Sequence, residues 1–135
     1  MIVADTNILV ALTIPSAHTS IAERVWDKDP LWFAPPLARS EFTNVVVKAL
    51  MAGSIDWQSI SELCAHFEQA VRITIAPPPT LVVQQSLAHR CSTYDTEFAL
   101  TAEALNCRVV TFDRQFRERF GKVAVSPDEF LSGGV

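Results

Sequence analysis

Two short apolar segments of this chain each end in an aspartate, and each has the composition of a buried strand. Ile2-Val3-Ala4 precedes Asp5, and Val109-Val110-Thr111-Phe112 precedes Asp113. Both segments are apolar and contain β-branched residues, which is typical of strands buried within a sheet. Ligands of open parallel sheets bind outside the carboxyl ends of the strands, and both aspartates are expected to lie there.

Helical and strand patterns alternate along the rest of the sequence. We expect strands at 2–5, 31–34, 73–75, 108–112 and, at an edge, 123–125; we expect helices at 7–14, from 16–20 to about 29, at 37–52, 57–71 (capped by Asp56), 80–91, 94–106 and 114–120, and a last helical turn at 126–131. This alternation predicts an α/β sandwich around a mainly parallel sheet. The Pro77–Pro79 run indicates a loop, because the composition does not change across it. We therefore expect one domain at 1–131 and a flexible tail at 132–135.

Composition favours a small cytoplasmic protein. The chain has 135 residues, enough for one domain, and 49% of them are hydrophobic. Apolar runs fall short of the ~20 residues that span a bilayer, and Asp5 interrupts what could otherwise resemble a signal peptide. Cys64, Cys91 and Cys107 form no C-x-x-C pair, and the three histidines are equally scattered. This pattern fits a reducing compartment and gives no zinc-ligand spacing.

Charge excludes one class of nucleic-acid-binding protein but leaves another open. The net charge of −4 argues against a protein that coats nucleic acid. A nuclease whose basic residues are local remains possible. The densest basic cluster directly follows Asp113 and consists of Arg114, Arg117, Arg119 and Lys122. These residues are either phosphate contacts or one solvated helix face, with Glu118 interspersed.

Two further acids open helical segments and fall on their apolar stripes. Glu41 precedes Val45 by one turn, so it faces inward with that valine. Asp95 heads a stripe of apolar residues spaced three and four positions apart, whereas Glu97 lies on the other side of the same helix. Each acid also has a structural explanation. Glu41 would be favoured by the helix dipole, and Asp95 could form a capping box with Ser92.

The two strand-end aspartates have polar neighbours suited to the same crevice. Asp5 or Thr6 could cap the following helix, and Thr6 and Asn7 could orient a ligand carboxylate or a water. Thr111 lies two residues before Asp113 on a strand, so both side chains point the same way.

Taken together, the four acids predict a metal site. Carboxylates that converge on one cleft repel one another unless a cation holds them. Their oxygen atoms are the ligands that hard divalent cations prefer, which points to metal-assisted chemistry on phosphate.

Four motifs, in order along nearly the whole chain, resemble those of PIN-domain ribonucleases, specifically the small VapC-type toxins of bacterial toxin–antitoxin pairs. The first is Ile2 to Asn7 (IVADTN), a strand leading into D-T-N. The second is Ser40-Glu41 at the head of the middle helix. Tyr94 to Ala102 (YDTEFALTA) is the most specific, and Val109 to Arg114 (VVTFDR) closes the pattern. Thr96 and Thr101 stand where the family has small apolar residues, but neither is one of the four acids.

The resemblance implies a three-layer α/β/α sandwich that acts as an endoribonuclease. It implies one or two Mg²⁺ or Mn²⁺ ions, a metal-activated water that attacks the phosphodiester in line, and products with 5′-phosphate and 3′-hydroxyl ends. It also implies a homodimer and a cognate antitoxin protein that wraps the toxin and blocks its pocket.

The resemblance implies the acidic pocket, and the chemistry of metal-assisted hydrolysis predicts a role for each site residue. The acidic pocket would consist of Asp5, Glu41, Asp95 and Asp113. Of these, Asp5, Asp95 and Asp113 would contact the metal, directly or through water, and Glu41 would bind metal or position the attacking water. Thr6, Asn7 and Thr111 would support these ligands, and Arg114 and Arg117 would hold backbone phosphates of the RNA.

Two other classes of protein could use acids at strand ends. A metal-dependent phosphatase of the haloacid-dehalogenase type needs a second aspartate two residues after the first, and this chain has Asn7 there. A catalytically silent acidic binding module, similar to a phospho-receiver, needs a lysine near its pocket. No lysine follows a strand end here before Lys122. The four intact acids also disfavour an inactive PIN scaffold.

Overall fold

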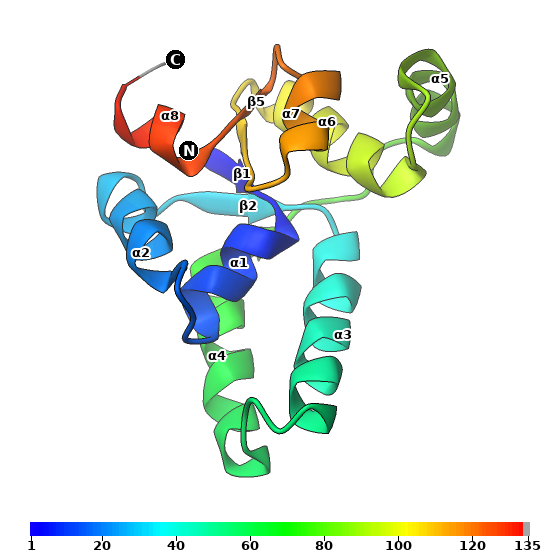
Figure 1. The fold of residues 1–135 in the computed structure, drawn as a ribbon. Helices are drawn as coiled ribbons and strands as arrows, with labels where there is room; N and C mark the ends of the chain where they lie inside the picture. Colours follow the sequence, from blue (N-terminus) through cyan, green and yellow to red (C-terminus); the bar gives the residue numbers. More distant parts are fainter. Residues whose placement is uncertain (134–135) are drawn as a thin grey trace.

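The computed structural model describes residues 1–133, and its centre is a five-stranded parallel sheet (Figure 1). The strands are β1 (Ile2–Ala4), β2 (Trp32–Ala34), β3 (Val71–Ile73), β4 (Val109–Val110) and β5 (Ala124–Val125), in the spatial order β3-β2-β1-β4-β5. Each neighbouring pair is parallel; Val3 of β1, for example, lies opposite Phe33 on one side and Val109 on the other. The expected parallel sheet is confirmed.

Helices cover both faces of this sheet and complete the expected three-layer α/β/α sandwich. They are α1 (Thr6–Thr13), α2 (Thr19–Lys28), α3 (Leu37–Met51), α4 (Ile60–Ala70), α5 (Pro79–His89), α6 (Thr93–Leu105), α7 (Arg114–Arg119) and α8 (Pro127–Leu131), with a 3₁₀ turn at Trp57–Ser59 before α4. In Figure 1, α1, α3 and α4 lie below the sheet, and α5, α6 and α7 lie above it. Helices α3 and α4 form an arm that projects away from the sheet.

The core lies between these layers. Strand β1 is buried along its whole length, as expected for a central parallel strand with helices on both faces. Phe42 of α3 stacks on Phe67 of α4 with ring centroids 4.2 Å apart, while Phe98 of α6 is fully buried on the opposite side of the sheet. Each such aromatic residue contributes roughly 1.5–3 kcal/mol through burial. The site residues are therefore carried by strongly packed elements.

The third strand differs from the sequence expectation. It occupies Val71–Ile73, immediately after α4, and not 73–75. Its register places Val71 opposite Trp32, so that Val71 is buried, whereas Ile75 is 92% exposed. Burial against β2 therefore selects the earlier residues. Asp56 is also not the side-chain cap that we expected, because only its backbone carbonyl is used, accepting from the Ser59 amide at 3.0 Å.

Helix α8 ends at Leu131, where the predicted domain ends, and Ser132 and Gly133 follow as a turn. Gly134 and Val135, the rest of the predicted tail at 132–135, lie outside the described residues. Over residues 1–133, none of the helices has both the length and the apolar character needed to cross a membrane.

Candidate active site

The strand order creates a crevice at the carboxyl end of the sheet. From β1 the chain passes to β2 and β3 on one side, and it then returns to β4 on the other side of β1. Parallel sheets bind ligands at such a switch point, because the connections diverge to opposite faces there. Asp5 directly follows β1, and its amide donates to the carbonyl of Val110 in β4 at 3.2 Å. Asp113 follows the same end of β4.

An open cleft of about 450 Å³ lies at this point and brings the four predicted carboxylates together. It is lined by Asp5, Thr6, Asn7, Val10, Glu41, Asn44, Val45, Asp95 and Asp113. Asp5 directly follows β1, and Asp113 lies three residues after β4, where it is the N-cap of α7. Glu41 is the fifth residue of α3, and Asp95 lies in the first turn of α6. The sequence reasoning missed Asn44, although it stands three residues after Glu41 and therefore shares its helix face.

Asp5 is held by a dense set of hydrogen bonds. Its Oδ1 caps α1 by accepting from the Thr6 amide at 2.7 Å. Its Oδ2 accepts from the Thr111 hydroxyl at 2.6 Å and from the side-chain amide of Asn7 at 3.3 Å. Asp5 therefore caps α1 with one carboxylate oxygen, as the sequence suggested, and its other oxygen accepts two side-chain hydrogen bonds.

Thr111 and Asn7 connect the ends of the two central strands. The Thr111 hydroxyl oxygen accepts from the Asn7 side chain at 3.1 Å and from the Asp113 amide at 3.0 Å. The Asn7 side-chain oxygen accepts from the Phe112 amide at 3.2 Å. Thr111 is fully buried, so this network fixes Asp5 and Asp113 relative to each other.

Glu41 is positioned by Thr6, whose hydroxyl donates to the Glu41 carboxylate at 2.7 Å. Asp113 itself is exposed and caps α7, because its Oδ1 accepts from the amides of Gln115 and Phe116 at 2.9 and 3.2 Å. Its second carboxylate oxygen has no such capping role.

Asp95 lies at the start of α6, where its amide donates to the Ser92 hydroxyl at 3.2 Å. The Ser92 cap suspected from the sequence is thus present. The Asp95 carboxylate is 4.0 Å from the Arg119 guanidinium. Among the ion pairs found within residues 1–133, this is the one that involves any of the four acids. Glu97, which the helical pattern placed on the other side of α6, is half-buried, and its charge helps to raise the pKa of Glu41.

Burial and mutual repulsion raise the pKa of three of the four carboxyl groups in the cleft. The pKa of Asp5 is raised from 3.8 to about 6, chiefly by burial and also by the charges of Glu41 and Asp95, against the lowering effect of the Thr111 and Thr6 hydrogen bonds. Burial also raises the pKa of Glu41 and of Asp95, with added repulsion between Glu41 and Asp95 and between Asp95 and Asp113. A cation in the cleft would relieve this repulsion.

The donor set of this cleft fits a hard divalent cation. Its charged ligands are all carboxylates, and its neutral donors are amide and hydroxyl oxygens, which suit Mg²⁺ or Mn²⁺. Within residues 1–133 the histidine, cysteine and acidic side chains nowhere form a ready-made ligand cluster of three. The four carboxylates thus line the cleft without forming a closed ligand set. Mg²⁺ commonly keeps several waters among its ligands and does not need a closed set.

The two arginines predicted to contact phosphate are both engaged within the protein. Arg114 pairs with Glu118 one turn later at 3.1 Å, and its side chain is 85% exposed. Arg117 donates to the backbone carbonyl of Thr111 at 3.0 Å and so supports the end of β4. Neither lines the acidic cleft.

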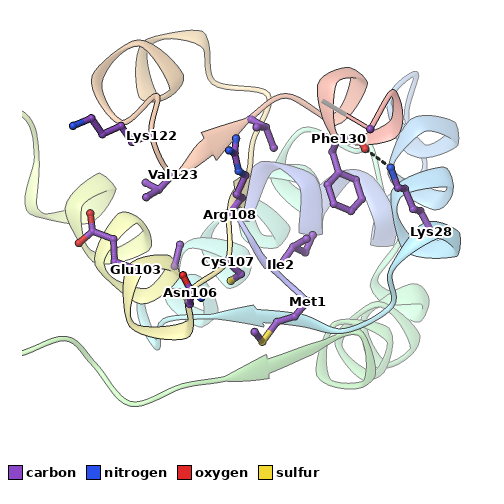
Figure 2. Close-up of a pocket in the computed structure, with 13 residues that line it drawn as sticks. Met1, Ile2, Lys28, Glu103, Asn106, Cys107, Arg108, Lys122, Val123 and Phe130 are labelled. Carbon is purple, nitrogen blue, oxygen red and sulfur yellow. Dashed lines mark hydrogen bonds between the residues drawn. The ribbon is translucent and has the colours of Figure 1, made fainter. Parts of the chain in front are cut away.

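A second cleft, of about 810 Å³, lies at the opposite end of the strands, where they begin (Figure 2). It is bordered by the starts of three strands, at Ile2, Arg108 and Val123, and by Phe130 of α8. Lys28 closes one side by bonding the Phe130 carbonyl. None of the four predicted acids lines this cleft; all four line the cleft at the carboxyl end of the sheet.

Comparisons with known proteins agree with this geometry. The family model described as the PIN domain matches residues 2–121. The crystal structure of PAE2754 from Pyrobaculum aerophilum is similar in fold, with a TM-score of 0.78 and 23% sequence identity over 97% of this chain and 86% of the other. Among curated proteins the search finds no match.

Proposed function

Because the chain belongs to the PIN-domain family, we propose that it is a Mg²⁺- or Mn²⁺-dependent endoribonuclease that acts as the toxin of a toxin–antitoxin pair. PIN domains are in general nucleases that bind divalent metal ions. The observation that carries the proposal for this chain is the convergence of Asp5, Glu41, Asp95 and Asp113 on one cleft at the switch point of the sheet. Carboxylates gathered in this way can hold a divalent cation, which would activate a water for phosphodiester hydrolysis.

Each residue of the cleft then has a proposed role. Asp5, Asp95 and Asp113 hold the metal, directly or through water, and Glu41 binds metal or orients the attacking water. Thr6, Asn7 and Thr111 fix these carboxylates through the hydrogen bonds described above. When bound, the metal lowers the pKa of a water and neutralises phosphate charge. Arg114 and Arg117 are proposed to hold backbone phosphates outside the cleft.

The proposal predicts RNA cleavage that depends on a metal ion. Purified protein, freed of any co-purifying antitoxin, is incubated with a panel of end-labelled RNAs in Mg²⁺, in Mn²⁺ and in EDTA. We expect cleavage in either metal, none in EDTA, and fragments with 5′-phosphate and 3′-hydroxyl ends. Mn²⁺ should also raise the melting temperature of the protein, because ligand that binds only the folded state stabilises it.

The same experiment separates the alternatives. Release of phosphate from a generic phosphomonoester, without RNA cleavage, would indicate the phosphatase. A rise in melting temperature with Mn²⁺ but no turnover of either substrate would indicate an acidic binding module. Cleavage that persists in EDTA would contradict a metal-dependent mechanism.

Two exposed apolar surfaces are the proposed binding sites of the two protein partners, the antitoxin and a second copy of the chain. Val47 and Met51, one turn apart on α3, are exposed together with Trp57 on the projecting arm. Helix α3 also carries Glu41, so a protein bound along this arm reaches the acidic cleft, and we assign the surface to the antitoxin. Val83 and Leu87, one turn apart on α5, form the second surface, which we assign to a second copy of the chain.

The dimer assignment predicts opposite results for two matched substitutions. Leu87→Glu places a charge on the α5 surface and should yield the monomer mass by light scattering. Met51→Glu places the same charge on the α3 surface and should leave the dimer intact. A monomeric wild type would overturn the homodimer, and a dimer lost only with Met51→Glu would move the interface to α3.

A cytoplasmic location is part of the proposal. Cys64, Cys91 and Cys107 are all free thiols in the described chain. Free cysteines fit the reducing compartment in which RNA substrates and an antitoxin would be encountered.

A further inference from the structure

The Arg119 side chain has a different kind of partner from the side chains of the other two arginines of α7. The Arg114 side chain is paired with Glu118, and the Arg117 guanidinium is bonded to the Thr111 carbonyl. The Arg119 guanidinium instead lies 4.0 Å from the Asp95 carboxylate, with 40% of its side chain exposed. Arg119 is thus the arginine of this helix that pairs with an acid of the cleft, while part of its side chain stays exposed to solvent.

The position of Arg119 follows from the placement of α7. Asp113 caps the first turn of this helix and Arg119 occupies the last, so the helix carries one acid of the cleft at one end and the cation at the other. The cation also sits at the helix C-terminus, where the macrodipole favours positive charge. Asp95 is 32% exposed; its pKa is raised by burial and by the charge of Asp113 and lowered by the charge of Arg119.

A polyanionic substrate needs a cation at this site. The four carboxylates repel a phosphodiester strongly, and a divalent metal offsets only part of their charge. A guanidinium next to the cleft can donate to two phosphate oxygens at once and supply the missing positive charge.

We propose that Arg119 is a substrate-binding residue that pairs with Asp95 in the metal-free protein and turns to an RNA phosphate when a divalent cation binds Asp95. This inference rests on the proposed nuclease function. Arg119 then competes with the metal for Asp95 and binds a phosphate of the substrate. Its removal should therefore raise the affinity for the metal and lower the affinity for RNA.

The test compares Arg119→Gln with Arg24→Gln. Arg24 is exposed on α2 and lies outside the acidic cleft, so both variants carry the same change in net charge. Mn²⁺ affinity is measured from the electron paramagnetic resonance signal of free Mn²⁺, and kcat and KM are measured with one short RNA. Arg119→Lys, which keeps the charge but loses the planar fork, is the conservative variant.

We expect Arg119→Gln to bind Mn²⁺ about two- to fivefold more tightly, because the competing ion pair is lost. We expect its KM for RNA to rise about tenfold with little change in kcat, as for the loss of one charge-assisted phosphate contact. Arg119→Lys should restore the wild-type Mn²⁺ affinity and only part of the KM, and Arg24→Gln should resemble the wild type in both.

Unchanged or weaker Mn²⁺ binding in Arg119→Gln would overturn the competition with metal. An unchanged KM, or an equal rise in Arg24→Gln, would overturn the phosphate contact. Failure of the proposed nuclease is seen separately, as a wild type that binds Mn²⁺ but cuts no RNA; the Mn²⁺ measurement then still decides whether Arg119 competes for Asp95.

Discussion

Asp5→Asn is expected to reduce metal-dependent RNA cleavage by roughly 10³-fold or more, the scale of losing a group essential to the transition state. Asp5 stands at the centre of the cleft, and its pKa of about 6 leaves it mainly ionised at neutral pH. An amide has nearly the same shape but lacks the charge that holds a divalent cation. Its oxygen can still cap α1 in place of Asp5 Oδ1, so the fold should remain intact.

Thermal unfolding as a function of pH checks that intact fold and the raised pKa together. The pKa of Asp5 is higher in the folded state, at about 6, than its ordinary value of 3.8. The folded state therefore holds the Asp5 proton more tightly between these values, and the contribution of Asp5 to stability falls as pH rises from about 4 to about 6. Asp5→Asn removes this dependence, so the variant should gain melting temperature relative to the wild type across that interval.

Asp27→Asn serves as the control, because Asp27 is exposed on α2 and carries the same charge change away from the cleft. It should cleave RNA like the wild type. Expression of the wild type, but not of Asp5→Asn, should also arrest growth of the host if the nuclease is a toxin. An Asp5→Asn protein that keeps its activity would remove Asp5 from the mechanism, and growth arrest by both proteins would argue against toxicity through cleavage.

Thr111→Val is expected to reduce activity about 10- to 100-fold, although Thr111 has no proposed contact with the metal. Its hydroxyl donates to Asp5 at 2.6 Å and accepts from the Asp113 amide at 3.0 Å, so both strand-end acids lose a fixed partner. Valine has the same shape but removes both hydrogen bonds, so that Asp5 Oδ2 keeps only the Asn7 side chain and the Asp113 amide loses its partner. This loss should lower the free energy of unfolding by about 1–3 kcal/mol. The Thr111 hydrogen bond lowers the pKa of Asp5, so its loss should also move the acidic limb of the activity profile to higher pH.

Thr111→Ser is the matched variant, because it retains the hydroxyl and loses one methyl group. Activity and the pH profile should stay close to those of the wild type, while stability falls modestly from the small cavity. Equal losses of activity in the valine and serine variants would show that packing at this position, and not the hydroxyl, supports the site.

The sequence predicted the layer architecture and the family because both are encoded in local patterns. Apolar runs of strand length alternate with helical stripes over nearly the whole chain, and a parallel sheet covered on both faces is the arrangement that buries them all. The motifs around Asp5, Glu41, Asp95 and Asp113 led to the PIN domain, and the family match over residues 2–121 confirms it. Two strands differ most from the prediction. Strand β4 covers only Val109–Val110 of the predicted 108–112, and β3 is shifted, since only pairing with β2 distinguishes Val71 from Ile75 as the buried residue.

Local patterns by themselves determined which elements form and which acids stand at their ends. The order of the strands, and hence the crevice between β1 and β4, required the tertiary structure. So did the raised pKa of Asp5, its hydrogen bond to a residue 106 positions away, and the approach of Arg119 to Asp95. Burial and side-chain pairing between residues so far apart in the sequence depend on how the chain packs. Local sequence patterns do not determine them.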